Sequence, residues 1–77
     1  MFFAGERLRL KTPTIAIAPD DQGKQTSVMV PSGDVVVLVE NVDEGDLLVR
    51  VDWRGTIYQM FSVDLRERGE ITKDSTA

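Results

Sequence analysis

Polar and apolar side chains alternate along much of the chain with the period of two that marks a half-buried β-strand. Residues 7–11 alternate charge with leucine, and residues 47–53 alternate apolar with polar positions. Residues 56–61 follow the second segment after Arg54 and Gly55, a pair typical of a two-residue hairpin turn. The pattern therefore predicts an antiparallel hairpin over residues 47–61 and a separate strand over residues 7–11.

A two-residue turn fixes which residues of the two hairpin strands lie opposite each other. One face of the hairpin is then apolar and faces the core, with Gln59 excluded from it, whereas a slip by one residue would bury Gln59. The predicted pairs are Trp53 with Thr56, Val51 with Tyr58, Val49 with Met60, Asp52 with Ile57, Arg50 with Gln59 and Leu48 with Phe61.

Three apolar side chains fall on the opposite, outward face of this hairpin: Leu48, Ile57 and Phe61. Single exposed hydrophobic residues are common, but a group of them indicates a surface that something covers. The candidate covers are the Phe2–Phe3 arm, the curvature of the sheet itself and a second copy of the chain. We expect a homo-oligomer, most simply a dimer, with these three residues in its interface.

The middle of the chain is less regular. Residues 12–26 contain Pro13 and Pro19 and end in a turn-rich stretch, and we interpret them as one long excursion between strands. Strand character returns at residues 26–30. A bend at residues 31–34 leads to residues 35–39, which are apolar on both faces and suit a long bent strand in a small barrel.

The last third of the chain closes the predicted fold. Residues 41–46 form a polar hairpin loop, residues 62–65 have the spacing of a single helical turn, and residues 66–71 suit a closing edge strand. Residues 72–77 are polar, and we expect a frayed tail there. The fold class expected is all-β, a small five-stranded barrel formed by one domain with an ordered part over about residues 5–71.

The size of the chain makes its core small. It has 77 residues and neither Cys nor His, so no disulfide and no Cys/His metal site is available to stabilise the fold. Stability must come from packing or from self-association. The residues that we expect to be largely buried are Leu8, Leu10, Val37, Val51 and Trp53.

Several short segments share a pattern: Gly5, Arg7 and Arg9, then Val51-Asp52-Trp53-Arg54-Gly55, then Phe61, Asp64 and Leu65. Over residues 5–71 this pattern resembles small bacterial SH3-like barrel proteins. The resemblance implies a five-stranded SH3-like barrel. Two families within that architecture are also similar in part: the type II dihydrofolate reductases and the SH3-like accessory subunits of photosynthetic complexes, which dock protein partners. The reductase motif V-Q-I-Y is not reproduced at residues 57–60.

Charge and hydropathy narrow the class of partner. The chain carries 13 acidic and nine basic residues and a formal net charge of −4. This balance disfavours nucleic acid, whose binding rests on clustered Lys and Arg. No stretch approaches the roughly 18 consecutive apolar residues of a membrane-spanning helix, and the apolar start is too short for a signal-peptide core. We therefore expect a cytoplasmic protein that does not bind membranes.

The sequence offers little catalytic chemistry. Without His or Cys it lacks the usual general base, the paired nucleophile and the usual zinc ligands. Asp43, Glu44 and Asp46 lie together, as do Asp20 and Asp21, but neither group has the ligand spacing of a calcium loop. A hydrated hairpin tip also gives no cleft for paired carboxylates. We expect no catalytic residue, no metal site and no cofactor.

The candidate residues for binding a partner are Trp53, Tyr58, Arg50 and Arg54. An aromatic ring at a strand end can line a groove for a peptide, which favours a non-catalytic module that binds a protein or peptide and self-associates. An alternative is an oligomer whose ligand or enzyme site forms only between subunits. A further alternative is weak nucleic-acid binding through these arginines together with Arg66, since arginines hold phosphates and aromatics stack on bases.

Overall fold

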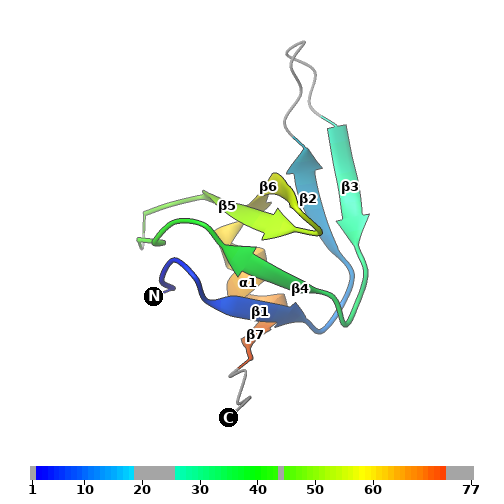
Figure 1. The fold of residues 1–77 in the computed structure, drawn as a ribbon, viewed down its shortest axis with the longest axis horizontal. Coiled ribbons are helices and arrows are strands. Elements are labelled where there is room, and N and C mark those ends of the chain that lie inside the picture. Colours follow the sequence, from blue (N-terminus) through cyan, green and yellow to red (C-terminus); the bar gives the residue numbers. More distant parts are fainter. Residues whose placement is uncertain (1, 19–25, 44, 73–77) are drawn as a thin grey trace.

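The structure is a computed structural model that describes residues 2–18, 26–43 and 45–72. Its strands form one antiparallel sheet in the order β3-β2-β6-β5-β4-β1-β7, with a single short helix between β6 and β7 (Figure 1). The elements are β1 (Arg7–Leu10), β2 (Thr14–Ala18), β3 (Thr26–Val30), β4 (Val35–Leu38), β5 (Leu48–Trp53), β6 (Thr56–Phe61), α1 (Ser62–Arg68) and β7 (Gly69–Ile71).

The β5–β6 hairpin has the predicted register, and all six predicted residue pairs are confirmed. Its turn has positive φ at both central residues, 55° at Arg54 and 84° at Gly55. This is the type I′ geometry whose twist matches that of the flanking strands. The Asp52 carboxylate accepts a hydrogen bond of 3.0 Å from the Gly55 amide, which holds the turn closed. The hairpin therefore sets which side chains face inward and which face outward.

The interpretation of residues 12–26 as one long excursion between strands is wrong for residues 14–18, and residues 19–25 lie outside the described residues. Thr14–Ala18 forms strand β2, which pairs along its whole length with β3 and also pairs with β6 through Ile17 and Gln59. Thr14 and Ala16 are fully buried, whereas Ile15 between them is exposed. The strand forms despite Pro13, because Pro13 lies just before it and removes no hydrogen bond from its ladder.

The expectation of an all-β fold with a short helix is confirmed, but the sheet has seven strands rather than five and is not closed into a barrel. β2 adds a strand within residues 12–26, whereas the predicted bend at residues 31–34 is found between β3 and β4.

The helix is longer than the predicted single turn and leaves only three residues to β7. Arg66, Glu67 and Arg68 are good helix formers and extend α1 until Gly69 ends it. A Cβ atom at Gly69 would lie only 2.7 Å from the Leu65 carbonyl oxygen, so the sharp exit from the helix requires glycine. Thr72, predicted to begin a frayed tail, is held in place because its amide donates a hydrogen bond to the Arg7 carbonyl. The rest of the predicted tail, residues 73–77, lies outside the described residues.

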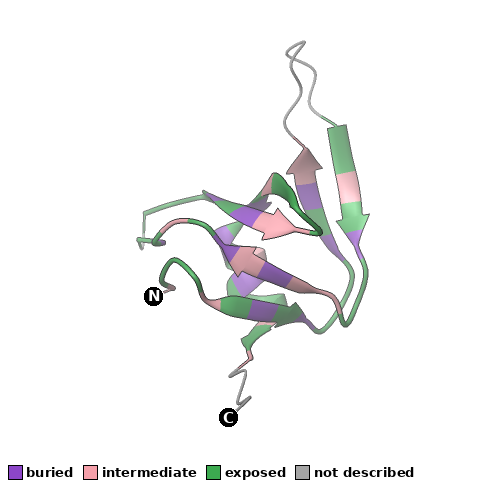
Figure 2. Cartoon of the chain, in the orientation of Figure 1, coloured by how far each residue is buried: buried purple, intermediate pink, exposed green. Residues whose placement is uncertain are grey.

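The core lies between the inward side chains of the curved sheet and α1 (Figure 2). Leu8, Leu10 and Val51 are fully buried, as predicted, but Val37 and Trp53 are only half-buried. On β4 the inward positions are Val36 and Leu38, one residue out of step with the prediction, since an apolar run gives no alternation to read. The buried apolar residues are Leu8, Leu10, Ala16, Val30, Val36, Leu38, Val42, Val49, Val51, Met60 and Leu65.

Candidate functional site

Three residues at the β5–β6 turn, together with Asp34 from the bend before β4, form a compact group that we call the rim cluster: Asp34, Trp53, Arg54 and Tyr58. The Trp53 indole Nε1 donates a hydrogen bond of 2.9 Å to the Asp34 carboxylate. The Arg54 guanidinium donates to the same oxygen at 3.0 Å and lies 4.8 Å from the centre of the Trp53 ring. The rings of Trp53 and Tyr58 are 5.4 Å apart and tilted by 58°. The Trp53 indole and the Arg54 guanidinium thus share one carboxylate, and Tyr58 packs against the Trp53 ring.

The rim cluster contains three of the four residues predicted to bind a partner, and the structure does bring them together. Their strongest hydrogen-bonding groups are engaged within the chain, because one Asp34 oxygen accepts from both Trp53 and Arg54. Arg54 is also neutralised there by an ion pair. The cluster therefore presents outward half-buried aromatic surface together with an exposed Arg54 side chain whose charge is paired with Asp34.

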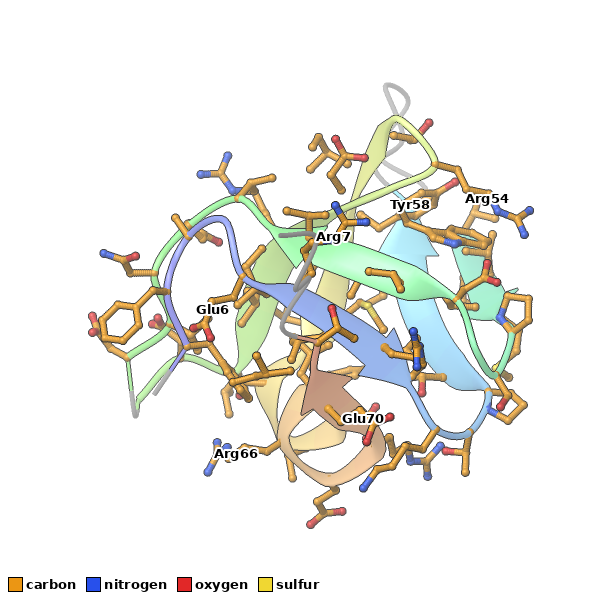
Figure 3. The ribbon with its side chains drawn as sticks, turned by 60° about the horizontal axis from the view of Figure 1, so that its bottom comes forward. Glu6, Arg7, Arg54, Tyr58, Arg66 and Glu70 are labelled. Atoms are coloured by element: carbon orange, nitrogen blue, oxygen red, sulfur yellow. The ribbon has the colours of Figure 1, made fainter. Side chains whose placement is uncertain are left out.

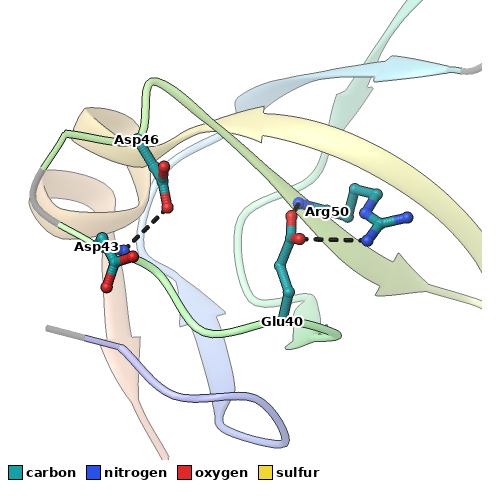
Figure 4. Close-up of polar contacts among 4 residues, drawn as sticks. All are labelled: Glu40, Asp43, Asp46 and Arg50. Carbon is teal, nitrogen blue, oxygen red and sulfur yellow. Dashed lines mark hydrogen bonds and ion pairs between the residues drawn. The ribbon is translucent and has the colours of Figure 1, made fainter.

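Arg50, the fourth predicted residue, is paired with Glu40 (Figure 4). Its amide donates to one Glu40 carboxylate oxygen at 3.0 Å, and its guanidinium donates to the other at 3.2 Å. The hydrogen bond from the Arg50 amide, followed by that from its guanidinium, lowers the pKa of Glu40 below its ordinary value of 4.5. Both side chains are exposed, so the pair contributes little to stability.

The predicted grouping of Arg66 with the other arginines is not found. Arg54 precedes β6 and Arg66 lies in α1, which follows β6, so the whole strand separates them. Figure 3 shows Arg66 at the lower left, far from Arg54 and Tyr58 at the upper right. Because Arg50 and Arg54 are each paired with a carboxylate, the structure does not assemble these arginines into a surface for phosphates.

A row of exposed apolar side chains crosses the outward face of four adjacent strands; we call it the outer row. Leu48 lies opposite Phe61, as predicted, and Ile15 lies opposite Met29. Because Ile17 pairs with Gln59, an antiparallel register places Ile15 beside Phe61 two residues further along. The row therefore runs Met29, Ile15, Phe61, Leu48 over β3, β2, β6 and β5, with exposed fractions of 54, 43, 40 and 37%.

The sequence pattern did not predict Ile15 or Met29 as members of the outer row. The alternation of Thr14, Ile15 and Ala16 indicates a strand and could have placed Ile15 on an outward face. The pairing of β2 with β6, which brings Ile15 beside Phe61, is a tertiary contact that this pattern does not show. Ile57, which was predicted to belong with Leu48 and Phe61, is also exposed but lies one outward position beyond Gln59 and opposite Asp52. It flanks the row rather than continuing it.

The N-terminal arm, one of the predicted covers, lies elsewhere. Phe2 forms a bridge with Val42 and packs against the core from that side, while Phe3 is exposed. Leu48, Ile57 and Phe61 each keep more than a third of their surface exposed with the arm in this position. Within the part of the chain that the structure describes, the outer row is left uncovered.

The acidic groups form no metal site within residues 2–18, 26–43 and 45–72, where no three His, Cys, Asp or Glu side chains gather closely enough to hold an ion. Asp46 instead accepts a hydrogen bond of 3.0 Å from the Asp43 amide and orders the loop before β5 (Figure 4). Asp20, Asp21 and Glu44 lie outside the described residues.

A shallow hollow lies where the β1–β2 connection meets the end of α1. It contains none of the predicted binding residues, and its Arg68 guanidinium already donates to the Pro13 carbonyl at 3.2 Å. The residues that line the hollow are Lys11, Thr12, Pro13, Glu67 and Arg68.

In the described parts of the chain, no helix has the length and apolar character needed to cross a membrane.

Comparison with known proteins adds no functional assignment, because the chain matches no protein family, no curated protein and no solved structure. Its function must be inferred from its own residues. The two surfaces that distinguish the molecule are the rim cluster and the outer row.

Proposed function

We propose that the protein is a non-catalytic protein-interaction module that works as a homo-oligomer, with the outer row as the contact between two copies. The observation that carries this proposal is the alignment of Met29, Ile15, Phe61 and Leu48 on one exposed face. Removing these apolar side chains from water lowers the free energy by about 25 cal/mol for each Å² of apolar surface buried.

A second copy of the chain is the occupant that we propose. Two copies of net charge −4 repel each other, so a contact between them is best made by a surface that adds no further acidic charge. None of the four residues of the outer row is charged. A row that crosses the strands can meet its own copy about a two-fold axis, which is the commonest symmetry of closed oligomers. Arg50 and Asp52, beside the row on β5, would form its polar rim.

We also propose that the rim cluster receives the protein partner of the oligomer. Trp53 and Tyr58 are half-buried aromatics held in place by Asp34 and Arg54, and a rigid aromatic surface loses little conformational freedom on binding. Because the Trp53 indole and the Arg54 guanidinium already donate to Asp34, the partner would contact ring edges and the apolar stem of Arg54. A peptide with an apolar side chain at its centre fits this chemistry.

We propose that the arrangement of this sheet and helix is SH3-like. Two neighbour relations support it: β1 lies between β4 and β7, and a short helix connects β6 to β7. The β2–β3 hairpin then takes the place of the long loop. This arrangement leaves the outward faces of β2, β3, β5 and β6 together on one side of the molecule.

The experiment that tests the proposal compares Phe61→Asp with Thr56→Asp by sedimentation velocity. Both substitutions put a carboxylate at an exposed position on β6, but only the first lies in the outer row. Phe61 is the N-cap residue of α1 and makes no side-chain cap, so Asp is compatible with the helix there.

We expect Phe61→Asp to give a smaller species than the unmodified chain and Thr56→Asp to leave the mass unchanged, since only the former would bury an unpaired carboxylate in the interface. An unmodified chain that is already monomeric, or a Phe61→Asp variant of unchanged mass, would contradict the proposal. Circular dichroism of both variants checks that each is folded.

A further inference from the structure

The two edges of the sheet differ in how they are protected. Strand β3 ends the sheet on one side and β7 ends it on the other (Figure 1). An edge strand presents unpaired amide and carbonyl groups, which proteins protect by shortness, by charge or by covering the edge. β7 has three residues and places Glu70 opposite Arg9, so it is both short and charged.

β3 has neither form of protection. Its five residues, Thr26–Val30, include no charged residue and no proline, and Thr26, Ser27 and Met29 are exposed. Among the described strands, β2 is its hydrogen-bonded neighbour on one side, and the other side has none. β-Branched and apolar residues at an open edge are suited to accepting a further strand.

We propose that the open edge of β3 pairs antiparallel with β3 of a second copy, so that the sheet continues from one chain into the next. This inference rests on the proposed self-association and adds a second contact to it. The two-fold axis lies perpendicular to the sheet at Val28. In that register all five residues of each β3 are paired, and Ser27 lies opposite Met29 of the second copy.

Symmetry makes a second copy a suitable occupant of this edge. A two-fold axis perpendicular to a sheet keeps outward residues outward in both copies, so the alternation of β3 is preserved across the new pair. β3 contains no charged residue, so pairing two copies of it adds no local repulsion between chains that each carry a net charge of −4.

The edge contact continues the outer row. Met29 ends the row at β3, and its side chain is the most exposed of the four. Across the proposed pair it becomes a diagonal neighbour of the second Met29, so that two rows join into one apolar surface. Contact between outward faces uses a different axis from contact between edges. A chain that makes both contacts closes into a tetramer with dihedral symmetry where the two axes cross at right angles.

Single cysteines test the edge directly, because the chain contains none of its own. Ser27→Cys places an exposed thiol on β3, and Glu70→Cys places one on β7 as the matched control. In the proposed register the two Ser27 positions are diagonal neighbours, about 7–8 Å apart. We would treat each variant with a short bis-maleimide at tens of micromolar and measure the covalent dimer on a denaturing gel.

We expect most of the Ser27→Cys protein to become covalent dimer and the Glu70→Cys protein to remain monomeric on the gel. Ser27→Cys should still crosslink when Phe61→Asp has removed the contact between outer rows. Crosslinking of both cysteine variants to the same extent, or of neither, overturns the edge contact.

The masses of three variants separate the two contacts. Ser27→Lys puts a charge on the edge and should leave the species joined by the outer row, whereas Phe61→Asp should leave the species joined by β3. The double variant should be monomeric. If Phe61→Asp lowers the mass and Ser27→Lys does not, the proposed function stands and the edge contact is wrong; if only Ser27→Lys lowers it, the outer-row contact is wrong.

Discussion

The rim cluster and the outer row are both half-exposed surfaces of the same small sheet, yet their side chains are satisfied differently. In the rim cluster, Asp34 accepts from both Trp53 and Arg54, and Arg54 also contacts the Trp53 ring. In the outer row, four apolar side chains lie side by side with no described segment over them. The first surface is complete within one chain, whereas the second gains by meeting another molecule.

This difference shows why residue type alone misidentifies contact surfaces. Arginine and tryptophan are typical of interfaces, so a reading of residue types alone selects the rim cluster as the contact surface. Within the fold, however, both Arg50 and Arg54 are paired with carboxylates. An outward-facing apolar side chain cannot be satisfied by an ion pair within the chain, because only removal from water stabilises it.

The largest expected effect separates the outer row from the interior. Leu38 is fully buried and Leu48 is partly exposed, so the same substitution measures two environments. Leu38→Ala should cost about 2–5 kcal/mol of unfolding free energy through lost transfer energy and a cavity. Leu48→Ala should cost the dilute protein clearly less, with a loss that grows as concentration rises. Chemical denaturation at two protein concentrations measures both, and equal, concentration-independent costs would contradict the comparison.

A smaller effect is expected within the rim cluster. Asp34→Ala removes the acceptor shared by Trp53 and Arg54 and should cost about 1.5–3 kcal/mol, while Asp34→Asn keeps an acceptor oxygen and should cost less. Trp53 is the only tryptophan, so its fluorescence reports this site alone. We expect a red-shifted emission in Asp34→Ala. Unchanged emission and stability would show that the cluster does not depend on Asp34.

The smallest effect concerns Glu40. Its pKa is lowered in the folded chain, so the ionised carboxylate stabilises the fold above its ordinary pKa of 4.5, and this contribution is lost as pH falls through the folded value. Glu40→Gln should therefore be slightly less stable than the unmodified chain at neutral pH, and the difference should vanish at a pH well below 4.5. Thermal unfolding at both pH values measures it; a difference that is independent of pH would contradict the assigned cause.

The hairpin shows how much of the fold the sequence predicts. Arg54-Gly55 fixed all six residue pairs of β5 and β6 because a two-residue turn permits one register only. The exposure of Leu48, Ile57 and Phe61 followed from that register. The apolar run of β4 gave no such signal, so its inward residues were predicted one position out of step.

The parts of the candidate site that could not be predicted depend on contacts distant in sequence. Asp34 reaches Trp53 only because the bend before β4 folds back onto the β5–β6 turn. Ile15 and Met29 join Phe61 only because β2 pairs with β6, which is a tertiary contact. A residue's own neighbours in the chain carry no information about either pairing.

In the proposed homo-oligomer, a second copy of the chain covers the outer row. Light scattering coupled to gel filtration of the unmodified protein, at tens of micromolar, tests it most directly. We predict a mass of at least twice the 8.6 kDa of one chain, falling toward that value on dilution. A mass of 8.6 kDa at every concentration would contradict the claim.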